Sequence, residues 1–220
     1  MEITLDQSIV LVQIREQVQQ RFIYCHNLAH SWDHVHRVYR LAEYIAKHEQ
    51  ADQFIVGMAA LMHDLGHTVK RKANEHHVDL SAKLASDLML TSQVSAKLQE
   101  AIIHAILAHS FSRGIEPRTL EAGAVRDADR LDALGAVGIM RWGIVGGQRE
   151  KTDRKPYLLD DPFAERHPLD DNRYMLDHFY TKLLKLEEGM MTETGRRLAQ
   201  RRTEFMRQYL GEFKREMELS

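Results

Sequence analysis

The spacing of apolar positions predicts a chain built of helices. Val38, Leu41 and Ile45 recur at three- and four-residue steps, the spacing of one helix face, and Ser31 is suited to cap the start of that helix. Further helices are predicted over residues 6–26, 76–91, 93–110, 118–134, 136–144, 171–187 and 192–217. No segment indicates a β-sheet, so the predicted fold class is all-α.

One predicted helix, FIVGMAALMHDL, is apolar on almost every side, which indicates a central and buried position. Asp52 is placed to cap its start, and Gly66 is expected to end it at the C′ position. The first helix is less clear, because its only stripe is weak and consists of Ile9, Val12, Glu16 and Gln20.

A different composition marks residues 146–172, GGQREKTDRKPYLLDDPFAERHPLDDN. This segment holds three of the four prolines and two adjacent glycines. A long loop in a compact domain is typically a functional lid or a disordered insert, and a solvated surface loop is an equal alternative.

Length and composition limit the class of protein. A chain of 220 residues fits one domain over residues 1–220, with a core at about 26–145 and C-terminal helices at about 171–218 packing on it. The single cysteine, Cys25, excludes a disulfide framework and favours the cytoplasm. We expect no signal peptide and no membrane span. A net charge of −2 gives no case for nucleic-acid binding.

Several of the 13 histidines lie where a metal ligand would lie. His34 shares the apolar face of Val38, although such a histidine is more often a hydrogen-bonded core residue. His63 and Asp64 end the most apolar helix, where an ionised carboxylate needs a cation. The alternative is a helix end that turns out to solvent.

The segment VRDADRLDALGAVGI, residues 125–139, supplies the remaining candidate. Asp129 lies on the helix face of Val125 and so is expected to approach the packed side. An ion pair with Arg126 or Arg130 on a surface helix is the alternative. Two imidazoles and two carboxylates would suit Mn²⁺, Mg²⁺, Fe²⁺, Co²⁺ or Ni²⁺, whereas a structural zinc site would be closed and usually thiolate-rich.

The pattern H…HD…D, with its His–Asp pair ending a buried helix, resembles the HD superfamily. SWDHVHRV, ALMHDLGH, HAILAHSFSRGI, DADRLDALGAVGI, DDPFAERHPLDD and LDHFYTKLLKL are together similar to the bacterial YedJ-like branch of HD phosphohydrolases. The resemblance implies an all-α HD helical bundle that hydrolyses phosphoester or phosphoanhydride bonds, with nucleotides as expected substrates. It also implies one divalent ion, with Mn²⁺ favoured, on His34, His63, Asp64 and Asp129.

The resemblance and the neighbouring charges also suggest catalytic and substrate contacts. The predicted catalytic residues are Asp64, His67 and His109, with Asp64 or Asp129 orienting water and His67 or His109 protonating the leaving oxygen. The predicted substrate-binding residues are Lys70, Arg130, Arg149, His178 and Lys182. For each of the three cations beside the metal motif, Lys70, Arg130 and Arg149, a solvated surface charge is an equal alternative. His76 or His77 corresponds to a histidine that some HD enzymes use for a second metal.

Two other functions are compatible with the sequence. A di-iron HD oxygenase would need six coherent ligands, adding for example His77 and His104. A non-catalytic HD module that senses a nucleotide would bind without turnover. Under the phosphohydrolase reading the partner is a phosphorylated small molecule, with no nucleic acid and no membrane involved.

Overall fold

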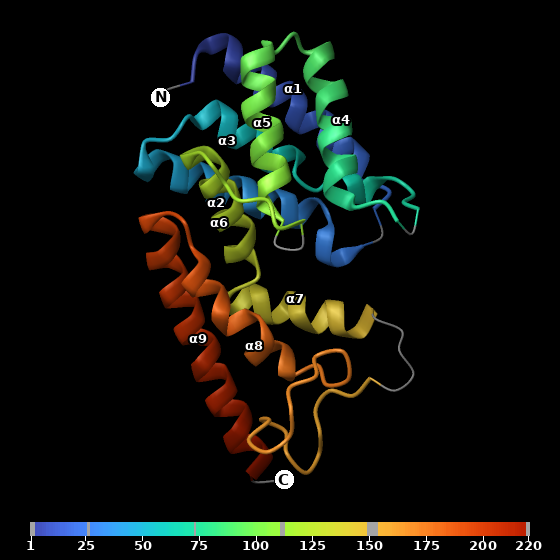
Figure 1. The fold of residues 1–220 in the computed structure, drawn as a ribbon, viewed down its shortest axis with the longest axis vertical. Coiled ribbons are helices and arrows are strands. Elements are labelled where there is room, and N and C mark those ends of the chain that lie inside the picture. Colours follow the sequence, from blue (N-terminus) through green and yellow to red (C-terminus); the bar gives the residue numbers. More distant parts are fainter. Residues whose placement is uncertain (1–2, 26, 73, 111–112, 149–153, 219–220) are drawn as a thin grey trace. The chain divides into compact units, whose positions relative to one another are not determined.

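The chain is helical over most of the part that the structure describes. The computed structural model describes residues 3–218 except 26, 73, 111–112 and 149–153 (Figure 1). Within these ranges there is no β-strand, and one isolated parallel bridge joins Lys155 to Tyr174. The predicted all-α fold class is therefore confirmed. Over the same ranges, no helix combines the length and the apolar character that a membrane crossing requires.

The chain forms two compact units, and each is discontinuous in sequence. The first unit comprises Met1–Asp129 and Met191–Gly195, and the second comprises Arg130–Met190 and Arg196–Ser220. The boundaries fall inside helix α6 (Leu120–Asp132) and near the start of helix α9 (Glu193–Glu218).

The first unit is assembled around helix α3 (Gln53–Met62), which contacts four other helices (Figure 1). These are α1 (Leu5–Phe22), α2 (Trp32–Glu49), α4 (His77–Thr91) and α5 (Ala96–His109). Two short 3-10 helices, η1 (Leu28–His30) and η2 (Leu65–Thr68), precede α2 and follow α3. Nearly all residues of α3 are buried, which confirms its predicted central position.

The helix starts follow the capping signals closely. Ser31 is the N-cap of α2, and the Asp52 carboxylate accepts from Phe54 N at 3.0 Å and from Ile55 N at 3.1 Å. The predicted end of α3 at Gly66 is wrong, because the helix ends at Met62 and Gly66 lies inside η2. Gly66 is needed there for packing rather than as a helix stop. A Cβ at this position would lie 2.0 Å from the carbonyl oxygen of His77.

Helix α1 buries a different face from the weak stripe predicted for it. Leu11, Ile14, Val18 and Phe22 form the buried face. Ile9 and Val12 are 50% and 57% exposed. The helix carries apolar residues on both sides, and the face with the larger and more regularly spaced set packs on α3.

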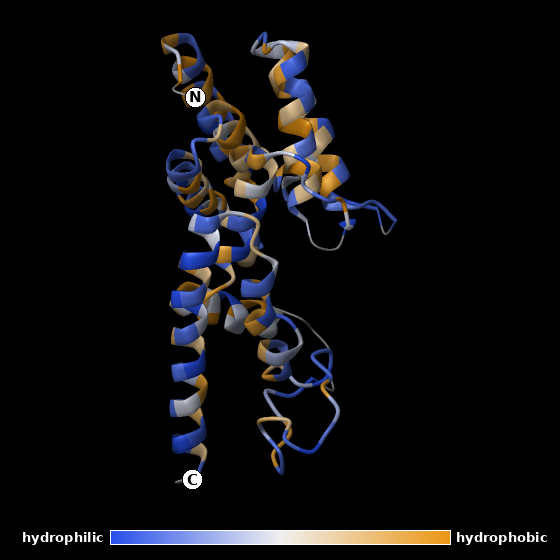
Figure 2. Ribbon diagram, turned by 60° about the vertical axis from the view of Figure 1, so that its left-hand side comes forward, coloured by the Kyte–Doolittle hydropathy of each residue, from blue (hydrophilic) through white to orange (hydrophobic). Residues whose placement is uncertain are grey.

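The second unit contains α7 (Gly135–Gln148), α8 (Asp177–Thr181), the 3-10 segment η4 (Leu183–Gly189) and most of α9. The predicted helix over 171–187 is wrong, since α8 is short and Lys182 has φ −137° and ψ −60°. Asp171 Oδ2 is bonded to His178 Nδ1 at 2.7 Å and to Thr181 Oγ1 at 2.9 Å. Such side-chain bonds compete with helix formation at residues 171–176. Figure 2 shows α9 as mainly hydrophilic, with apolar residues spaced along it.

The described part of the long loop, residues 154–172, is held by buried carboxylates. Asp161 accepts from the backbone N–H groups of Glu165, Arg166 and His167. His167 lies between two acids, with Nδ1 2.8 Å from Asp161 Oδ2 and Nε2 3.1 Å from Asp177 Oδ2. The hydrogen bond to Asp161 raises the pKa of His167 despite the opposing effect of burial. This part of the loop is therefore held in one conformation by its own buried hydrogen bonds.

Candidate metal centre

Three helices of the first unit bring two histidines and two aspartates together. His34 lies in the first turn of α2, His63 is the C-cap of α3 with Asp64 next to it, and Asp129 lies near the end of α6. His34 and His63 are fully buried, Asp64 is 2% exposed, and the Asp129 side chain is 29% exposed. The four residues that the HD resemblance assigned as ligands therefore share one mostly buried site.

Their facing atoms are separated as the ligands of one ion would be. His34 Nε2 lies 3.3 Å from His63 Nε2, 3.4 Å from Asp64 Oδ2 and 3.4 Å from Asp129 Oδ1. His63 Nε2 lies 3.6 Å from Asp64 Oδ2 and 3.9 Å from Asp129 Oδ1. Adjacent ligands at metal bonds of about 2.1 Å are about 3 Å apart, so a slight contraction would bring these four atoms to the spacing of ligands of one ion.

The protonation of His63 tests whether a cation fits. His63 Nδ1 lies 2.8 Å from the carbonyl oxygen of Ala60, which can only accept, so Nδ1 carries the proton. Burial lowers the pKa of His63 to about 4, and the imidazole is neutral at pH 7. Its Nε2 lone pair therefore points at two carboxylates. That arrangement is repulsive without a cation between them, and it is the arrangement that metal ligands require.

The carboxylates supply negative charge to the same place. Burial alone would raise the pKa of Asp64, but the neighbouring His63 and His30 lower it well below its usual value. Burial also opposes ionisation of Asp129, but the hydrogen bond with His34 and the charges of His109, His34 and His63 together lower its pKa well below its usual value. Two carboxylates and two imidazoles form a mixed nitrogen and oxygen set, which fits Mn²⁺, Mg²⁺, Fe²⁺, Co²⁺ or Ni²⁺.

The other oxygen of Asp64 faces a second group of imidazoles. Asp64 Oδ1 lies 3.8 Å from His67 Nε2, 3.9 Å from His77 Nε2 and 3.9 Å from His109 Nε2. His109 Nδ1 lies 2.5 Å from the carbonyl oxygen of Ile106, which leaves Nε2 as an acceptor. The predicted catalytic residues His67 and His109 are thus beside Asp64, and His77 joins them.

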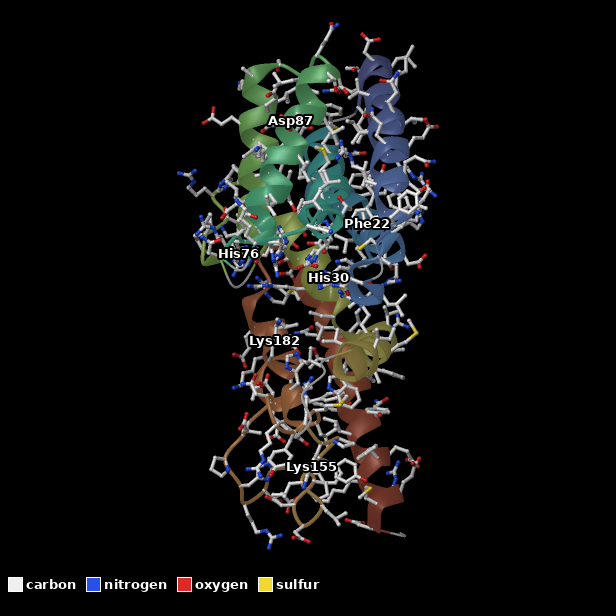
Figure 3. All side chains as sticks on the ribbon, turned by 90° about the vertical axis from the view of Figure 1, so that its right-hand side faces the viewer. Phe22, His30, His76, Asp87, Lys155 and Lys182 are labelled. Atoms are coloured by element: carbon white, nitrogen blue, oxygen red, sulfur yellow. The ribbon has the colours of Figure 1, made fainter. Side chains whose placement is uncertain are left out.

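Close packing of η2 against α4 puts His77 into this group. Gly66 N donates to Ser81 Oγ at 2.8 Å, and the absence of a side chain at Gly66 lets the His77 carbonyl approach. In Figure 3, His30 and His76 mark the same end of the helices of the first unit, and Asp87 lies further along α4. His104 has another environment, because its Nε2 accepts from Arg118 N at 3.0 Å.

The three aspartates of DADRLD have three different partners. Asp129 faces His34 and His63, as described above. Asp127 is fully buried and accepts from the backbone N–H groups of Met191 and Thr192. Asp132 forms a 3.0 Å ion pair with Arg141 within the second unit. The alternative of a surface ion pair does not describe Asp129, whose described contacts are with imidazoles.

The predicted substrate contacts are dispersed along the chain. Lys70 is exposed just after η2 in the first unit, and Arg149 lies outside the described residues. In the second unit, Arg130 is 6% exposed and donates from Nη1 to the Gly189 carbonyl oxygen at 2.5 Å. His178 is held by Asp171, and Lys182 is exposed at the end of α8. Their role in binding substrate stays a prediction.

Two residues near the predicted ones were not expected from the sequence. Asp171 orients His178 but stands seven residues before it, inside a segment that reads as the start of a helix. His30 lies 2.7 Å from Asp64, and its only sequence signal is its place one turn before His34. Neither signal identifies a partner, because both contacts are tertiary.

A helical fold whose buried central helix ends in a paired His–Asp, with further His and Asp ligands from neighbouring helices, defines an HD-type protein. The HD domain family model matches residues 31–134, which include all four residues of the candidate metal centre. The chain is 38% identical to YpgQ of Bacillus subtilis over 210 residues, covering 93% of this chain and 92% of YpgQ. It therefore belongs to the HD family.

Solved structures agree with this assignment over nearly the whole chain. YpgQ of Bacillus subtilis in complex with ADP has a TM-score of 0.74 at 32% identity, covering 96% of this chain and 97% of that one. An HD-superfamily hydrolase from Bacillus thuringiensis has a TM-score of 0.73 at 27% identity, covering 97% and 100%. A shorter match is to ribonuclease Y of Thermoanaerobacter pseudethanolicus, 32% identical over 56% of this chain and 22% of that protein.

Proposed function

We propose that this protein is a divalent-metal-dependent phosphohydrolase that cleaves phosphoester or phosphoanhydride bonds of nucleotides. The observation that carries the proposal is the convergence of His34 Nε2, His63 Nε2, Asp64 Oδ2 and Asp129 Oδ1. The two imidazole nitrogens lie 3.3 Å apart and 3.4 to 3.9 Å from the carboxylate oxygens. Membership of a family that contains HD-superfamily hydrolases supports hydrolysis. The ADP bound to YpgQ supports a nucleotide as the substrate.

The residues around Asp64 would have different roles in the reaction: metal binding, orientation of water and proton transfer. His34, His63, Asp64 and Asp129 would hold one divalent ion, with Mn²⁺ favoured, and that ion supplies Lewis acidity toward a phosphoryl oxygen when bound. Asp64 and Asp129 accept hydrogen bonds and so can orient a water molecule for in-line attack on phosphorus. His67 and His109 lie on the other side of Asp64, and His67 could protonate a leaving oxygen there. His109 could do so only after its Nε2, which is an acceptor in this structure, takes up a proton.

Cations of the chain would bind the phosphate groups of the substrate. Lys70 is exposed close after η2, and we propose it as a phosphate contact together with Arg130, Arg149, His178 and Lys182. Arg130 already donates to a carbonyl oxygen, so its contribution needs a separate test. Arg130→Lys keeps the charge but loses the planar donor geometry, and a change in KM without a change in stability would support a phosphate contact.

The experiment is a hydrolysis panel with matched variants. Release of phosphate and of pyrophosphate is measured from nucleoside tri-, di- and monophosphates, deoxynucleotides and a short RNA, each with Mn²⁺, Mg²⁺ and Co²⁺. Wild type is compared with Asp64→Ala and Asp129→Asn. Asp87→Asn is the control, because Asp87 is an exposed carboxylate on α4 (Figure 3).

The expected result is metal-dependent turnover of a nucleotide that both site variants abolish and the control keeps. The phosphorus-containing product then identifies the bond that is cleaved. Cleavage of RNA alone would replace the nucleotide substrate with a polynucleotide. Tight nucleotide binding without turnover under any metal would favour a sensing module over an enzyme.

A di-iron oxygenase remains a second candidate because of the imidazoles on the far side of Asp64. His77 and His109 lie on the Oδ1 side, where a second ion could share the carboxylate. His104, which had been considered for this role, accepts from Arg118 N instead. Two bound irons per chain with consumption of O₂ would support the oxygenase. One bound ion, with phosphate release and no O₂ uptake, would exclude it.

A further inference from the structure

His30 lies closer to the Asp64 carboxylate than the other imidazoles around it. His30 Nδ1 lies 2.7 Å from Asp64 Oδ2, whereas the other five imidazoles lie 3.4 to 3.9 Å from an oxygen of this carboxylate. A separation of 2.7 Å is that of a charge-assisted hydrogen bond. An ionised carboxylate can only accept, so Nδ1 of His30 carries the proton and donates it.

One contact of the His30 ring and two contacts of its backbone hold the residue beside Asp64. It stacks on His67, with ring centroids 4.2 Å apart and an angle of 15° between planes. Its backbone is held in η1, where His30 N donates to the Asn27 carbonyl oxygen at 3.0 Å. The Cys25 thiol donates to the carbonyl oxygens of both His30 and His67, each at 3.6 Å. The donor is therefore in place before any ligand binds.

The position of this donor determines how Asp64 is used. The two oxygens of a carboxylate are equivalent, so a half-turn about the Cβ–Cγ bond leaves the site unchanged. Smaller rotations turn the carboxylate plane away from the arrangement in which one oxygen faces His34 and His63 while the other faces His67, His77 and His109. The His30 hydrogen bond to Oδ2 favours that arrangement over the rotated ones. Partners of this kind typically change metal affinity or activity by about 10- to 100-fold when they are removed.

We propose that His30 is a positioning residue that holds Asp64 in its ligand orientation and thereby raises the affinity of the candidate metal centre. The inference rests on the proposed metal site and adds a residue to it. It also predicts that metal binding requires a hydrogen-bond donor at the Nδ1 position of residue 30, and not an imidazole that binds the metal itself.

Two substitutions separate these requirements. His30→Asn puts an amide N–H close to the Nδ1 position and so keeps the donor. His30→Phe keeps a planar ring for stacking on His67 and removes the donor. His48→Phe is the matched control, because His48 Nδ1 is also bonded, 2.8 Å from the Tyr44 carbonyl oxygen, and its ring also packs on a neighbour, at an exposed place on α2.

The measurement is Mn²⁺ binding to the full chain, stripped with a chelator, followed by calorimetry and by the spectroscopic signal of free Mn²⁺. We expect His30→Phe to weaken Mn²⁺ binding by about 10- to 100-fold. His30→Asn should stay within about threefold of wild type, His48→Phe should match wild type, and Asp64→Ala should not bind. Thermal unfolding without metal is measured beside binding: His30→Asn, which keeps the donor to the buried Asp64, should match wild type, whereas His30→Phe, which loses it, should unfold at a lower temperature while remaining folded at the temperature of the binding assay.

The outcomes distinguish the positioning role from the metal site itself. Wild-type affinity in His30→Phe would overturn the positioning role and leave the metal site standing. Equal weakening in His30→Asn and His30→Phe would also overturn it, since it would mean that the imidazole itself is a ligand. No Mn²⁺ binding by wild type, or equal binding by Asp64→Ala, would overturn both proposals.

Discussion

Replacing Asp127 by alanine should destabilise the protein strongly without removing its metal-binding residues. The Asp127 side chain is fully buried and accepts from Met191 N at 2.9 Å, from Thr192 N at 2.7 Å and from Thr192 Oγ1 at 2.7 Å. Together these bonds attach the segment before α9 to α6 within the first unit. Alanine would leave two backbone N–H groups without their acceptor.

The expected magnitude follows from the number and kind of these bonds. Hydrogen bonds to a charged group contribute about 1.5–3 kcal/mol each, and a buried donor left unsatisfied costs about 1–3 kcal/mol. Contributions that share one acceptor are not additive, so we expect a loss of about 3–5 kcal/mol in the free energy of unfolding. Asp127→Asn retains one acceptor oxygen and should lose less, about 1–3 kcal/mol.

The assay is urea unfolding in the presence of a chelator, so that metal binding does not contribute. Asp129→Ala is the informative comparison, because the same motif supplies it and its described role is in the metal centre. That variant should keep its metal-free stability and lose the stabilisation that Mn²⁺ gives. A loss below about 1 kcal/mol in Asp127→Ala would refute the reasoning from its hydrogen bonds. So would a normal fold that no longer binds Mn²⁺.

Three other outcomes follow from the same structure. Gly66→Ala should lower the free energy of unfolding by about 3 kcal/mol or more, because the new Cβ would lie 2.0 Å from the His77 carbonyl oxygen. Gly143→Ala is the control, since Gly143 on α7 has open space around it, and it should leave the free energy of unfolding unchanged or slightly raised. Chelation should lower the melting temperature of protein pre-loaded with Mn²⁺ at about 100 times Kd by about 5–10 °C, and should not affect Asp129→Ala. The pKa of His167 is raised in the folded state, so its contribution to stability is complete below about pH 6.5 and is lost as the pH rises through the folded-state pKa. In His167→Gln the free energy of unfolding should therefore depend less on pH in that range.

The sequence predicted well those features whose signals are local. Asp52 accepts from the first N–H groups of α3, as a residue of its type before an apolar run should. The buried position of α3 followed from apolar residues on every side. The four candidate ligands were singled out because an ionisable pair ends a buried helix and because His34 and Asp129 lie on apolar helix faces. The HD resemblance then joined them in one predicted ligand set, and their role as ligands stays a prediction.

The features that were missed depend on side-chain partners that helical periodicity does not identify. Both faces of α1 carry apolar residues, and only packing against α3 decides that Leu11 is buried and Val12 exposed. A helical pattern over 171–187 does not reveal that Asp171 bonds to His178 and to Thr181. Periodicity indicates which residues would share a helix face, but it does not show where side-chain hydrogen bonds prevent the helix from forming.

The two oxygens of Asp64 explain why substitutions at this residue and at Asp129 should give different information. Oδ2 faces His34, His63 and His30, whereas Oδ1 faces the second group of imidazoles. Removing Asp64 therefore disturbs both groups at once, and its effect on turnover cannot be divided between metal binding and proton transfer. The close contacts of Asp129 are with His34 and His63, on the Oδ2 side of Asp64, so Asp129→Asn leaves the His67 and His77 side of the Asp64 carboxylate in place. If added Mn²⁺ at high concentration restores turnover to Asp129→Asn and not to Asp64→Ala, the oxygen on the far side of Asp64 has a role beyond holding the ion.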